Sequence, residues 1–356
     1  MKSYRVAVVA GDGIGPEVIG CATDVLDAAC RAVSGFHLEL IPAPAGAGTY
    51  QETGEALPAA SLLACREADA IFLGACGLPG VRYPDGTEII PQVTLRIVLD
   101  LYAGIRPART LPGVPIPLSG APSIDFVVVR ESTEGIFASL GGGIVLGDSV
   151  ATDTQIITRR GTERVVRSAF RLARRRARPE PRVTCVDKAN ILRSFAFFRK
   201  VFDEVAAEFS DVAADHLYVD AAALELVRKP ERFDVIVTEN LLGDILSDLA
   251  AGLVGGLGVA PSGDVGDRHA VFQPCHGTAP DLIGRGVANP LATILSGVML
   301  LDHLADSHDD PAPRASARRI EAAVVAALKA GEAQTADVGG SASTMEATRA
   351  VLRRIG

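Results

Sequence analysis

Short β-prone runs alternate with longer helical stretches along the whole chain, and this alternation restricts the possible folds more than any other feature. We expect strands over residues 4–10, 37–41, 70–75, 126–130, 182–187 and 233–239. We expect helices over residues 17–33, 57–67, 161–176, 191–209, 221–227, 242–252, 289–302 and 315–330. Such alternation predicts an α/β fold with a substantial parallel sheet.

Two segments depart from this pattern. Residues 139–159 are glycine-rich and then β-prone with alternating polar residues, which predicts an exposed β arm. The edges of such an arm need a partner to cover them, so we expect it to contribute to a dimer contact. Residues 305–316 are polar and contain proline, and we expect a surface loop there.

Composition limits the class of protein. The chain has 356 residues, of which 48% are hydrophobic, enough for a large core and more than one lobe. Its net charge of −8 argues against a nucleic-acid binder, and the basic run 171–182 is interpreted as the solvated end of a helix. No apolar run free of glycine and charge is long enough to cross a membrane. The cysteines are scattered and no signal peptide is evident, so we expect reduced thiols and a cytoplasmic location.

Asp244 and Asp248 lie four residues apart in the apolar run NLLGDILSDLAAG, so they share one face of the expected helix. Two like charges on an apolar helix are unfavourable unless something positive binds them. A hard divalent cation such as Mg²⁺ takes carboxylate oxygens as ligands. By spacing alone, a solvated polar helix face is an equally good interpretation.

Three arginines are candidates for binding an anionic substrate. Arg96 and Arg106 flank the run LRIVLDLYAGIRPAR, which we expect to be helical, and Arg130 ends an expected strand. The guanidinium group is a planar fork that suits carboxylates, and a substrate with two or three carboxylates needs several such forks. For each arginine singly, a surface ion pair is the alternative.

Lys188 and Asp220 each lie just before an expected helix. Lys188 follows the strand 182–187, at the edge where open α/β sheets bind ligands. Partial burial would lower the pKa of a lysine there and suit it to proton transfer, whereas an ion pair with Asp187 is the alternative. Asp220 is a candidate third metal carboxylate or, alternatively, the N-cap of a helix.

Two turn-rich segments could contact a nucleotide. Residues 11–15 follow a strand and precede a helix, but the spacing of their glycines is not that of a dinucleotide fingerprint, so a tight structural turn is favoured. Residues 271–290 are rich in proline and glycine, and long loops in compact domains are usually functional. Their backbone amides, with His276, Asp281 and Asn289, could enclose an adenosine whose ribose hydroxyls are free.

Taken together, these motifs resemble the β-decarboxylating dehydrogenases, a family of isocitrate, 3-isopropylmalate, homoisocitrate and tartrate/D-malate dehydrogenases. The resemblance covers nearly the whole chain and is carried by GDGIGPEV, LDLYAGIRPAR, VRESTEG, DKAN, VDAAALELV, FDVIVTENLLGDILSDLAAGL and HGTAPDLIGRGVANP. It implies oxidation, with decarboxylation, of a malate-type 2-hydroxy acid similar to 3-isopropylmalate. It also implies NAD and Mg²⁺ or Mn²⁺ as cofactors.

The resemblance implies a role for each candidate residue. The substrate carboxylates would be bound by Arg96, Arg106 and Arg130, and the metal by Asp220, Asp244 and Asp248. Lys188 corresponds to the catalytic lysine, with Asp220 beside it in the catalytic set, and Asn190 to the asparagine that follows that lysine. The cofactor would be bound by His276, Gly277, Thr278, Ala279, Asp281 and Asn289, and an acid at the position of Asp281 goes with NAD rather than NADP.

The resemblance also implies a two-lobed α/β fold with a mixed, largely parallel sheet, helices on both faces and a β arm for dimerisation. It implies a homodimer with shared active sites as well. Residues 1–101 and 255–356 would form the cofactor-binding lobe. Residues 102–254 would form the lobe for substrate, metal and dimerisation, with the arm at about 139–159. Each site would borrow Lys188 and Asp220 from the partner chain.

The chain departs from the family pattern in three places. Phe137 stands where the family usually has a tyrosine that donates the last proton, a contribution of about a hundred- to ten-thousand-fold in rate. A tartrate/D-malate-type enzyme with little or no decarboxylation and a non-catalytic member are therefore alternatives. The substrate-selecting segment 84–96 is atypical, and Gln92 and Thr94 predict a modestly polar pocket there. Gln273 replaces a glutamate that is common in the isopropylmalate enzymes.

Overall fold

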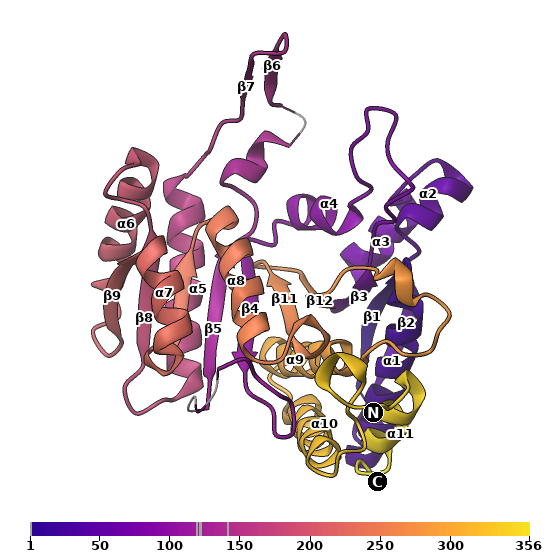
Figure 1. The fold of residues 1–356 in the computed structure, drawn as a ribbon. Helices are drawn as coiled ribbons and strands as arrows, with labels where there is room; N and C mark the ends of the chain where they lie inside the picture. The colour runs from indigo at the N-terminus through magenta and orange to yellow at the C-terminus, as the bar shows by residue number, and fades with distance from the viewer. Residues whose placement is uncertain (1, 119, 121–122, 141) are drawn as a thin grey trace.

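A ten-stranded mixed sheet runs through the molecule, so the expected α/β fold is confirmed (Figure 1). The computed structural model describes residues 2–118, 120, 123–140 and 142–356. The sheet order is β2-β1-β3-β12-β11-β4-β5-β10-β8-β9. The strands are β1 (Lys2–Gly11), β2 (Phe36–Pro42), β3 (Ala70–Ala75), β4 (Ala103–Arg109), β5 (Asp125–Glu131), β8 (Arg182–Asp187), β9 (Ala213–Tyr218), β10 (Val235–Thr238), β11 (Pro261–Val265) and β12 (Ala270–Pro274).

Two parallel blocks of strands meet at antiparallel strands in the middle of the sheet. β2, β1, β3 and β12 pair in parallel, and so do β5, β10, β8 and β9. Between them β11 is antiparallel to both β12 and β4, and β4 is antiparallel to β5. Side chains on β4 and β11 therefore lie where the two halves of the sheet join.

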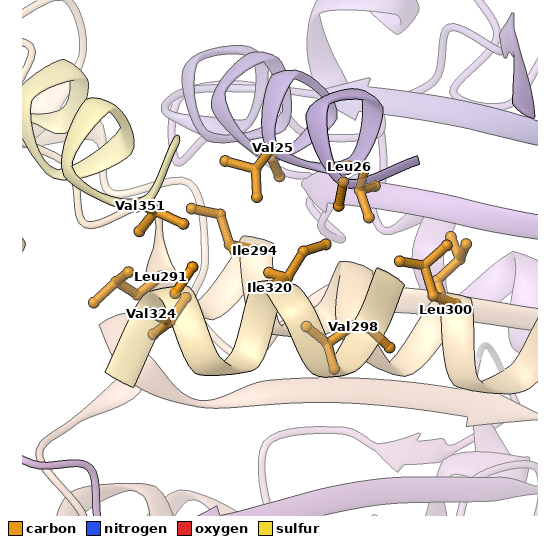
Figure 2. Close-up of a cluster of buried hydrophobic side chains, with 14 of the residues drawn as sticks. Val25, Leu26, Leu291, Ile294, Val298, Leu300, Ile320, Val324 and Val351 are labelled. Atoms are coloured by element: carbon orange, nitrogen blue, oxygen red, sulfur yellow. The ribbon is translucent and has the colours of Figure 1, made fainter. Parts of the chain in front are cut away.

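Helices α1, α9, α10 and α11 form the largest buried cluster with the first block. Figure 2 shows Val25 and Leu26 of α1 facing Ile294 of α9 and Ile320 of α10. Complete burial of such side chains is worth about 1.5–3 kcal/mol each. No helix in the described part of the chain is long and apolar enough to cross a membrane. The α-helices are α1 (Gly15–Val33), α2 (Ala47–Thr53), α3 (Ala59–Glu67), α4 (Pro91–Val98), α5 (Arg159–Arg176), α6 (Arg193–Ala206), α7 (Val219–Arg228), α8 (Asn240–Leu253), α9 (Leu291–His308), α10 (Pro311–Lys329) and α11 (Thr344–Leu352).

The two halves of the molecule have largely separate cores. Two buried clusters draw only on residues 102–254, and another draws only on residues outside that range. The largest cluster includes Leu111 and Val114, which follow β4, so the segment after β4 packs onto the other half. The sheet continues across both halves, and the predicted division into 1–101 with 255–356 and 102–254 stays a prediction.

The β arm projects from the second half as a hairpin of β6 (Ile144–Leu146) and β7 (Val150–Thr152) (Figure 1). Its large apolar side chains, Ile144, Val145, Leu146 and Val150, are exposed, and Val145 is 72% accessible to solvent. The prediction of an arm within 139–159 is therefore confirmed for this hairpin. Its role in a dimer stays a prediction.

Four strands were absent from the sequence prediction: β4, β9, β11 and β12. The run LRIVLDLYAGIRPAR was expected to be helical, but α4 ends at Val98 and Arg106 lies in β4. The chain reverses at Asp100, whose φ of 52° is incompatible with a continuous helix. Arg96 and Arg106 thus belong to a helix and a strand, respectively.

The prediction of a surface loop at 305–316 is wrong. Helix α9 continues to His308 and α10 begins at Pro311, which leaves only two residues between them. Asp309 ends α9 in the left-handed conformation, and the Asp310 side chain accepts a hydrogen bond from the Ala312 N–H at 3.1 Å. A proline in the first turn is compatible with a helix because that N–H needs no partner there, so Pro311 begins the helix instead of ending it.

Candidate active site

A cavity of about 180 Å³ opens where the two halves of the sheet meet. Its walls come from the ends of β3 and β12, from α4, β4, β5 and α8, and from the start of the loop after β12. It brings together many of the residues predicted from the sequence: Arg96, Arg106, Arg130, Asp244, Asp248, His276 and Gly277. Three guanidinium groups and two carboxylates therefore line the same cavity.

Arg96 and Arg106 share a buried carboxylate, Asp264 of β11, that the sequence analysis missed. The Asp264 carboxylate accepts from the Arg96 Nε at 3.0 Å and from the Arg106 Nη2 at 2.9 Å. Burial would raise the pKa of Asp264, but the two guanidinium charges outweigh it and lower the pKa to about 2. Burial opposes the charge of Arg106, and Asp264 raises the pKa of that arginine above its usual value.

Arg130 is held by the first turn of α8. Its Nε and Nη2 donate to the Asn240 Oδ1 at 2.9 and 2.7 Å, and its Nη1 contacts Asp244. Burial and the charge of Arg96 lower the pKa of Arg130 to about 10. The close approach depends on Gly243, because a Cβ there would lie 2.6 Å from the Arg130 Cγ.

Phe137 lies against the same guanidinium, with the Arg130 Cζ 5.3 Å from the centre of its ring. It belongs to a short 3₁₀ helix, Ile136–Ser139, that follows β5. A guanidinium within about 6 Å of an aromatic ring is attracted to the face of that ring. The position where the family usually has a tyrosine is therefore adjacent to a predicted substrate arginine.

Asp244 and Asp248 lie one turn apart on α8, as their spacing predicts. The helix starts with the Glu239 carboxylate accepting the Leu242 N–H at 2.8 Å. Partial burial and the charge of Asp244 raise the pKa of Asp248. A cation between the two carboxylates would relieve both effects, and their oxygens are ligands that Mg²⁺ and Mn²⁺ accept.

Lys188 and Asp220 do not line this cavity. They contact each other at the end of β8 and the start of α7, and the Asp220 side chain is 69% exposed. The hydrogen bond from Lys188 lowers the pKa of Asp220. Among the described residues of one chain, no three potential metal ligands converge.

The alternatives for these two residues are wrong. Asp187 bonds Arg199 at 2.7 Å and the Ala189 N–H at 2.8 Å, so it is not the partner of Lys188. The residue before α7 is Tyr218, so Asp220 is not the N-cap of that helix.

The predicted cofactor loop follows β12 and rests on the turn at residues 11–15. The Ile14 N–H donates to the Thr278 carbonyl at 3.0 Å, so this turn supports the loop, and its interpretation as a tight structural turn stays a prediction. The His276 Nδ1 lies 2.9 Å from the Gly277 carbonyl, and burial lowers the pKa of His276. Its Nε2 is buried without a protein partner among the described residues, as expected of a ring that serves a ligand.

Other residues of this loop differ in their exposure and in whether their polar groups are free to bind a ligand. Asp281 is exposed, and Ala279 is in the left-handed conformation with a φ of 40°. Asn289 is 6% exposed, and its amide is occupied, since it accepts from the Leu291 N–H and donates to Asp337, each at 3.0 Å. The Asn289 side chain therefore has a structural role in one chain.

The substrate-selecting segment contributes one polar side chain to the cavity. Gln92 of α4 lines it, and the Gln92 Oε1 is buried without a protein partner among the described residues. Thr94 is exposed and does not line the cavity, so the expectation of a pocket made by both residues is wrong for Thr94.

Comparison with known proteins places the chain among characterised relatives. The family model described as isocitrate/isopropylmalate dehydrogenase matches residues 5–351. The chain is 41% identical to the 3-isopropylmalate/3-methylmalate dehydrogenase of Methanocaldococcus jannaschii, with 99% of both chains covered. It is 47% identical to the 3-isopropylmalate dehydrogenase of Streptomyces coelicolor over 92% of both chains, and 42% identical to the isocitrate/homoisocitrate dehydrogenase of Thermus thermophilus over 99% of both. The crystal structure of isocitrate dehydrogenase from Methylococcus capsulatus is similar, with a TM-score of 0.86, 36% identity and 99% coverage of both chains.

Proposed function

Because the chain belongs to the isocitrate/isopropylmalate dehydrogenase family, we propose that it oxidises a malate-type 2-hydroxy acid similar to 3-isopropylmalate, with NAD and Mg²⁺ or Mn²⁺. The observation that carries this proposal is the cavity in which Arg96, Arg106 and Arg130 face Asp244 and Asp248. Guanidinium forks bind carboxylates, and paired carboxylates bind a hard cation. A malate-type acid coordinated to a cation presents both kinds of group.

In the proposed mechanism each side chain acts on a defined part of the substrate. The three arginines bind and orient its carboxylates. Asp244 and Asp248 hold the cation together with Asp220 of the partner subunit. A Mg²⁺ or Mn²⁺ held by these carboxylates would supply a positive charge that favours ionisation of the substrate hydroxyl and offsets the charge developed on loss of CO₂. Lys188 of the partner subunit takes the hydroxyl proton.

We place the cofactor against the loop after β12. NAD held there would supply the hydride acceptor for oxidation of the carbon that carries the hydroxyl group. The unpartnered Nε2 of His276 and the exposed backbone at Gly277 support contact with the cofactor. Thr278 and Ala279 continue the same loop, and the exposed carboxylate of Asp281 supports a preference for NAD, because it would repel a 2′-phosphate.

A homodimer with shared sites is part of the proposal. Large apolar side chains are exposed on α7, on α8 and beside Lys188, namely Leu224, Val227, Leu241, Ile245, Ile191 and Leu192. An exposed apolar surface of this kind is typical of an interface. These residues belong to the predicted metal helix α8, to α7, which carries Asp220, and to the segment that follows Lys188. A twofold contact through them would bring one protomer's Lys188–Asp220 pair toward its partner's cavity. All six cysteines are free, which supports a cytoplasmic location.

The direct test is a substrate screen that measures NADH and CO₂ together, with 3-isopropylmalate, D-malate, tartrate, isocitrate and homoisocitrate. We expect NADH formation that requires Mg²⁺ or Mn²⁺ and stops with EDTA. We expect the reduction of NADP to be much slower than that of NAD. Absence of turnover with every acid would contradict the proposal. Calorimetry would then identify a non-catalytic member as a folded protein that binds neither metal nor NAD.

A second candidate function is oxidation with little or no decarboxylation, as in a tartrate/D-malate-type enzyme. Phe137 favours it, because a phenyl ring next to Arg130 offers no O–H to protonate an enol. A non-catalytic role is disfavoured, since buried charged groups without a ligand are unfavourable to retain.

Gln92 provides a test of substrate preference. Its unpartnered Oε1 needs a donor from the substrate or from water, so Gln92→Leu should favour an apolar side group. We expect kcat/KM for 3-isopropylmalate relative to D-malate to rise by about tenfold, the scale of one hydrophobic contact in a pocket. Thr94→Val, on the exposed side of α4, is the matched control and should leave this ratio unchanged. An unchanged ratio in Gln92→Leu would show that Gln92 does not contact the side group.

A further inference from the structure

Asp264 is a charged residue without access to solvent in the middle of the sheet. Its side chain is 1% exposed and lies between the guanidinium groups of Arg96 and Arg106. Two buried guanidinium groups without a counter-charge would be strongly unfavourable. The carboxylate on β11 therefore neutralises part of the positive charge that the cavity gathers for a substrate.

The atoms that Asp264 contacts determine how the arginines face the cavity. It bonds Arg96 through Nε, so the two terminal nitrogens of Arg96 have no hydrogen-bond acceptor among the described residues and remain for a ligand. It bonds Arg106 through Nη2, while the Arg106 Nη1 donates to the Gly263 carbonyl at 3.0 Å. Both side chains line the cavity, so a carboxylate behind them fixes the direction of both forks.

The backbone around Asp264 makes room for this arrangement. Asp264 pairs with Gly104 of β4 in the antiparallel register. A Cβ at Gly104 would lie 3.1 Å from the Asp264 Oδ1 and 2.7 Å from the Ser132 Oγ. A side chain at that position would displace the carboxylate, so the sequence of β4 is suited to an acid on β11.

Gln273 of β12 is the third residue that contacts the Asp264 side chain. The Gln273 Nε2 donates to the Asp264 Oδ2 at 3.0 Å. A glutamate here, which is common in the isopropylmalate enzymes, would place a second carboxylate against the first. Two carboxylates at that distance cannot both ionise without a large rise in one pKa. The amide of Gln273 is therefore the electrostatic complement of Asp264.

We propose that Asp264 is the positioning residue of the substrate arginines, and that the counter-charge of the cavity resides on Asp264 of β11 while Gln273 of β12 serves as its neutral donor. This inference rests on the proposed function in that the ligand of the arginines is a dicarboxylate. Under this inference, Asp264 and Gln273 act as a pair in which one member is charged and the other is neutral. The charge can therefore be moved from one position to the other only if both residues are changed.

The test uses three variants of the full chain. Asp264→Asn replaces one carboxylate oxygen by an NH₂ group, which cannot accept a hydrogen bond. If the NH₂ group takes the place of Oδ1, Arg106 loses its acceptor; if it takes the place of Oδ2, both Arg96 and Gln273 lose theirs. We expect KM for the best acid of the screen to rise at least about tenfold, with kcat changed by less than about threefold, because loss of a buried charge partner weakens binding strongly. The double variant Asp264→Asn/Gln273→Glu moves the charge across the hydrogen bond, and should bring KM back to within about threefold of the unmodified protein.

Gln273→Glu alone keeps the test decisive if Asp264→Asn fails to fold. Its two adjacent carboxylates share one proton at low pH and acquire a second negative charge as pH rises. We therefore expect KM to increase with pH across the neutral range in this variant and not in the unmodified chain.

Asp234→Asn is the matched control. Asp234 is another buried carboxylate that holds arginines, with the Arg176 Nε at 2.7 Å, but it lies outside the cavity. This variant should lose thermal stability with no change in KM. The same pattern in Asp264→Asn, or a double variant no better than that single variant, would overturn the inference.

Binding of malonate, an inert dicarboxylate, separates this inference from the proposed function. We expect calorimetry with Mg²⁺ present to show malonate binding that weakens at least about tenfold in Asp264→Asn. Absence of NADH formation with every acid, together with this weakening, would contradict the proposed function alone. Normal turnover, together with equal malonate affinity in both proteins, would contradict the inference alone.

Discussion

Mixing two inactive variants, Lys188→Ala and Asp248→Asn, should restore catalysis. Alone, we expect each variant to lose about a hundred- to ten-thousand-fold in kcat, the range for loss of an acid–base group or of metal-bound charge stabilisation. In a twofold dimer with shared sites, each heterodimer has one site with both lesions and one with none. Random pairing should therefore return about a quarter of the unmodified activity.

The physical basis of this prediction is the separation of the residues within one chain. Lys188 and Asp220 contact each other on an open surface, away from the cavity that holds Asp248. In one protomer a proton acceptor outside the cavity cannot reach the substrate hydroxyl. Helix α7 carries Asp220 and α8 carries Asp248, and both helices expose apolar residues, including Leu224 and Ile245, that are suited to a contact between protomers.

A second pair of variants, with both lesions in the same part of the site, is the control for this experiment. Lys188→Ala mixed with Asp220→Ala should restore nothing, because both lesions affect the part of the site that is supplied by the partner. The two chains of each pair would be co-expressed with different tags. NADH formation would be measured on the randomly paired dimers, where about a quarter of the unmodified activity is expected, and on the purified heterodimer, where one intact site of two should give about half. Restoration in neither pair would contradict shared sites, and restoration in both would contradict the assignment of Lys188 and Asp220 to the same part.

The residues on α8 were predictable from the sequence because helical spacing alone places Asp244 and Asp248 on one face. Their surroundings were not, because the approach of Arg130 depends on a strand more than a hundred residues away in the chain. Strand β4 was missed since Gly104 and Pro107 are poor strand formers, yet pairing with β5 and β11 stabilises it. Tertiary contacts outweigh local preference in this strand.

Asp264 shows the same limit more sharply. In the sequence it is one acid in the short run PSGDVGD, which reads as a turn. Its role exists only because β11 pairs with both β12 and β4 and so brings Gln273 and Arg106 to its sides. The one signal in the sequence was Gln273, which departs from the family pattern. The sequence did not show that Asp264 is the residue that Gln273 contacts.

Phe137→Tyr should raise the yield or the rate of CO₂ release if decarboxylation is native to this enzyme. The Phe137 ring lies beside Arg130, which lines the cavity, so we expect an added hydroxyl to lie near the substrate carboxylates that Arg130 would bind. There it could protonate the enol left by CO₂, a step in which a positioned acid contributes about a hundred- to ten-thousand-fold. We expect the ratio of CO₂ to NADH to approach one, or single-turnover CO₂ release to accelerate by up to about a hundredfold.

Two controls separate the hydroxyl from other effects of the substitution. Phe197→Tyr adds the same hydroxyl to a ring that also lies over an arginine, with the Arg159 Cζ 5.8 Å away. Arg159, unlike Arg130, does not line the cavity, so this variant should change neither quantity. Phe137→Leu removes the ring and should weaken substrate binding through Arg130 without releasing more CO₂. If Phe137→Tyr leaves both the ratio and the rate unchanged, the last proton comes from water or another group. If the ratio is near zero in both proteins, the native reaction ends at the oxidised acid, which is the chemistry that a phenyl ring at this position permits.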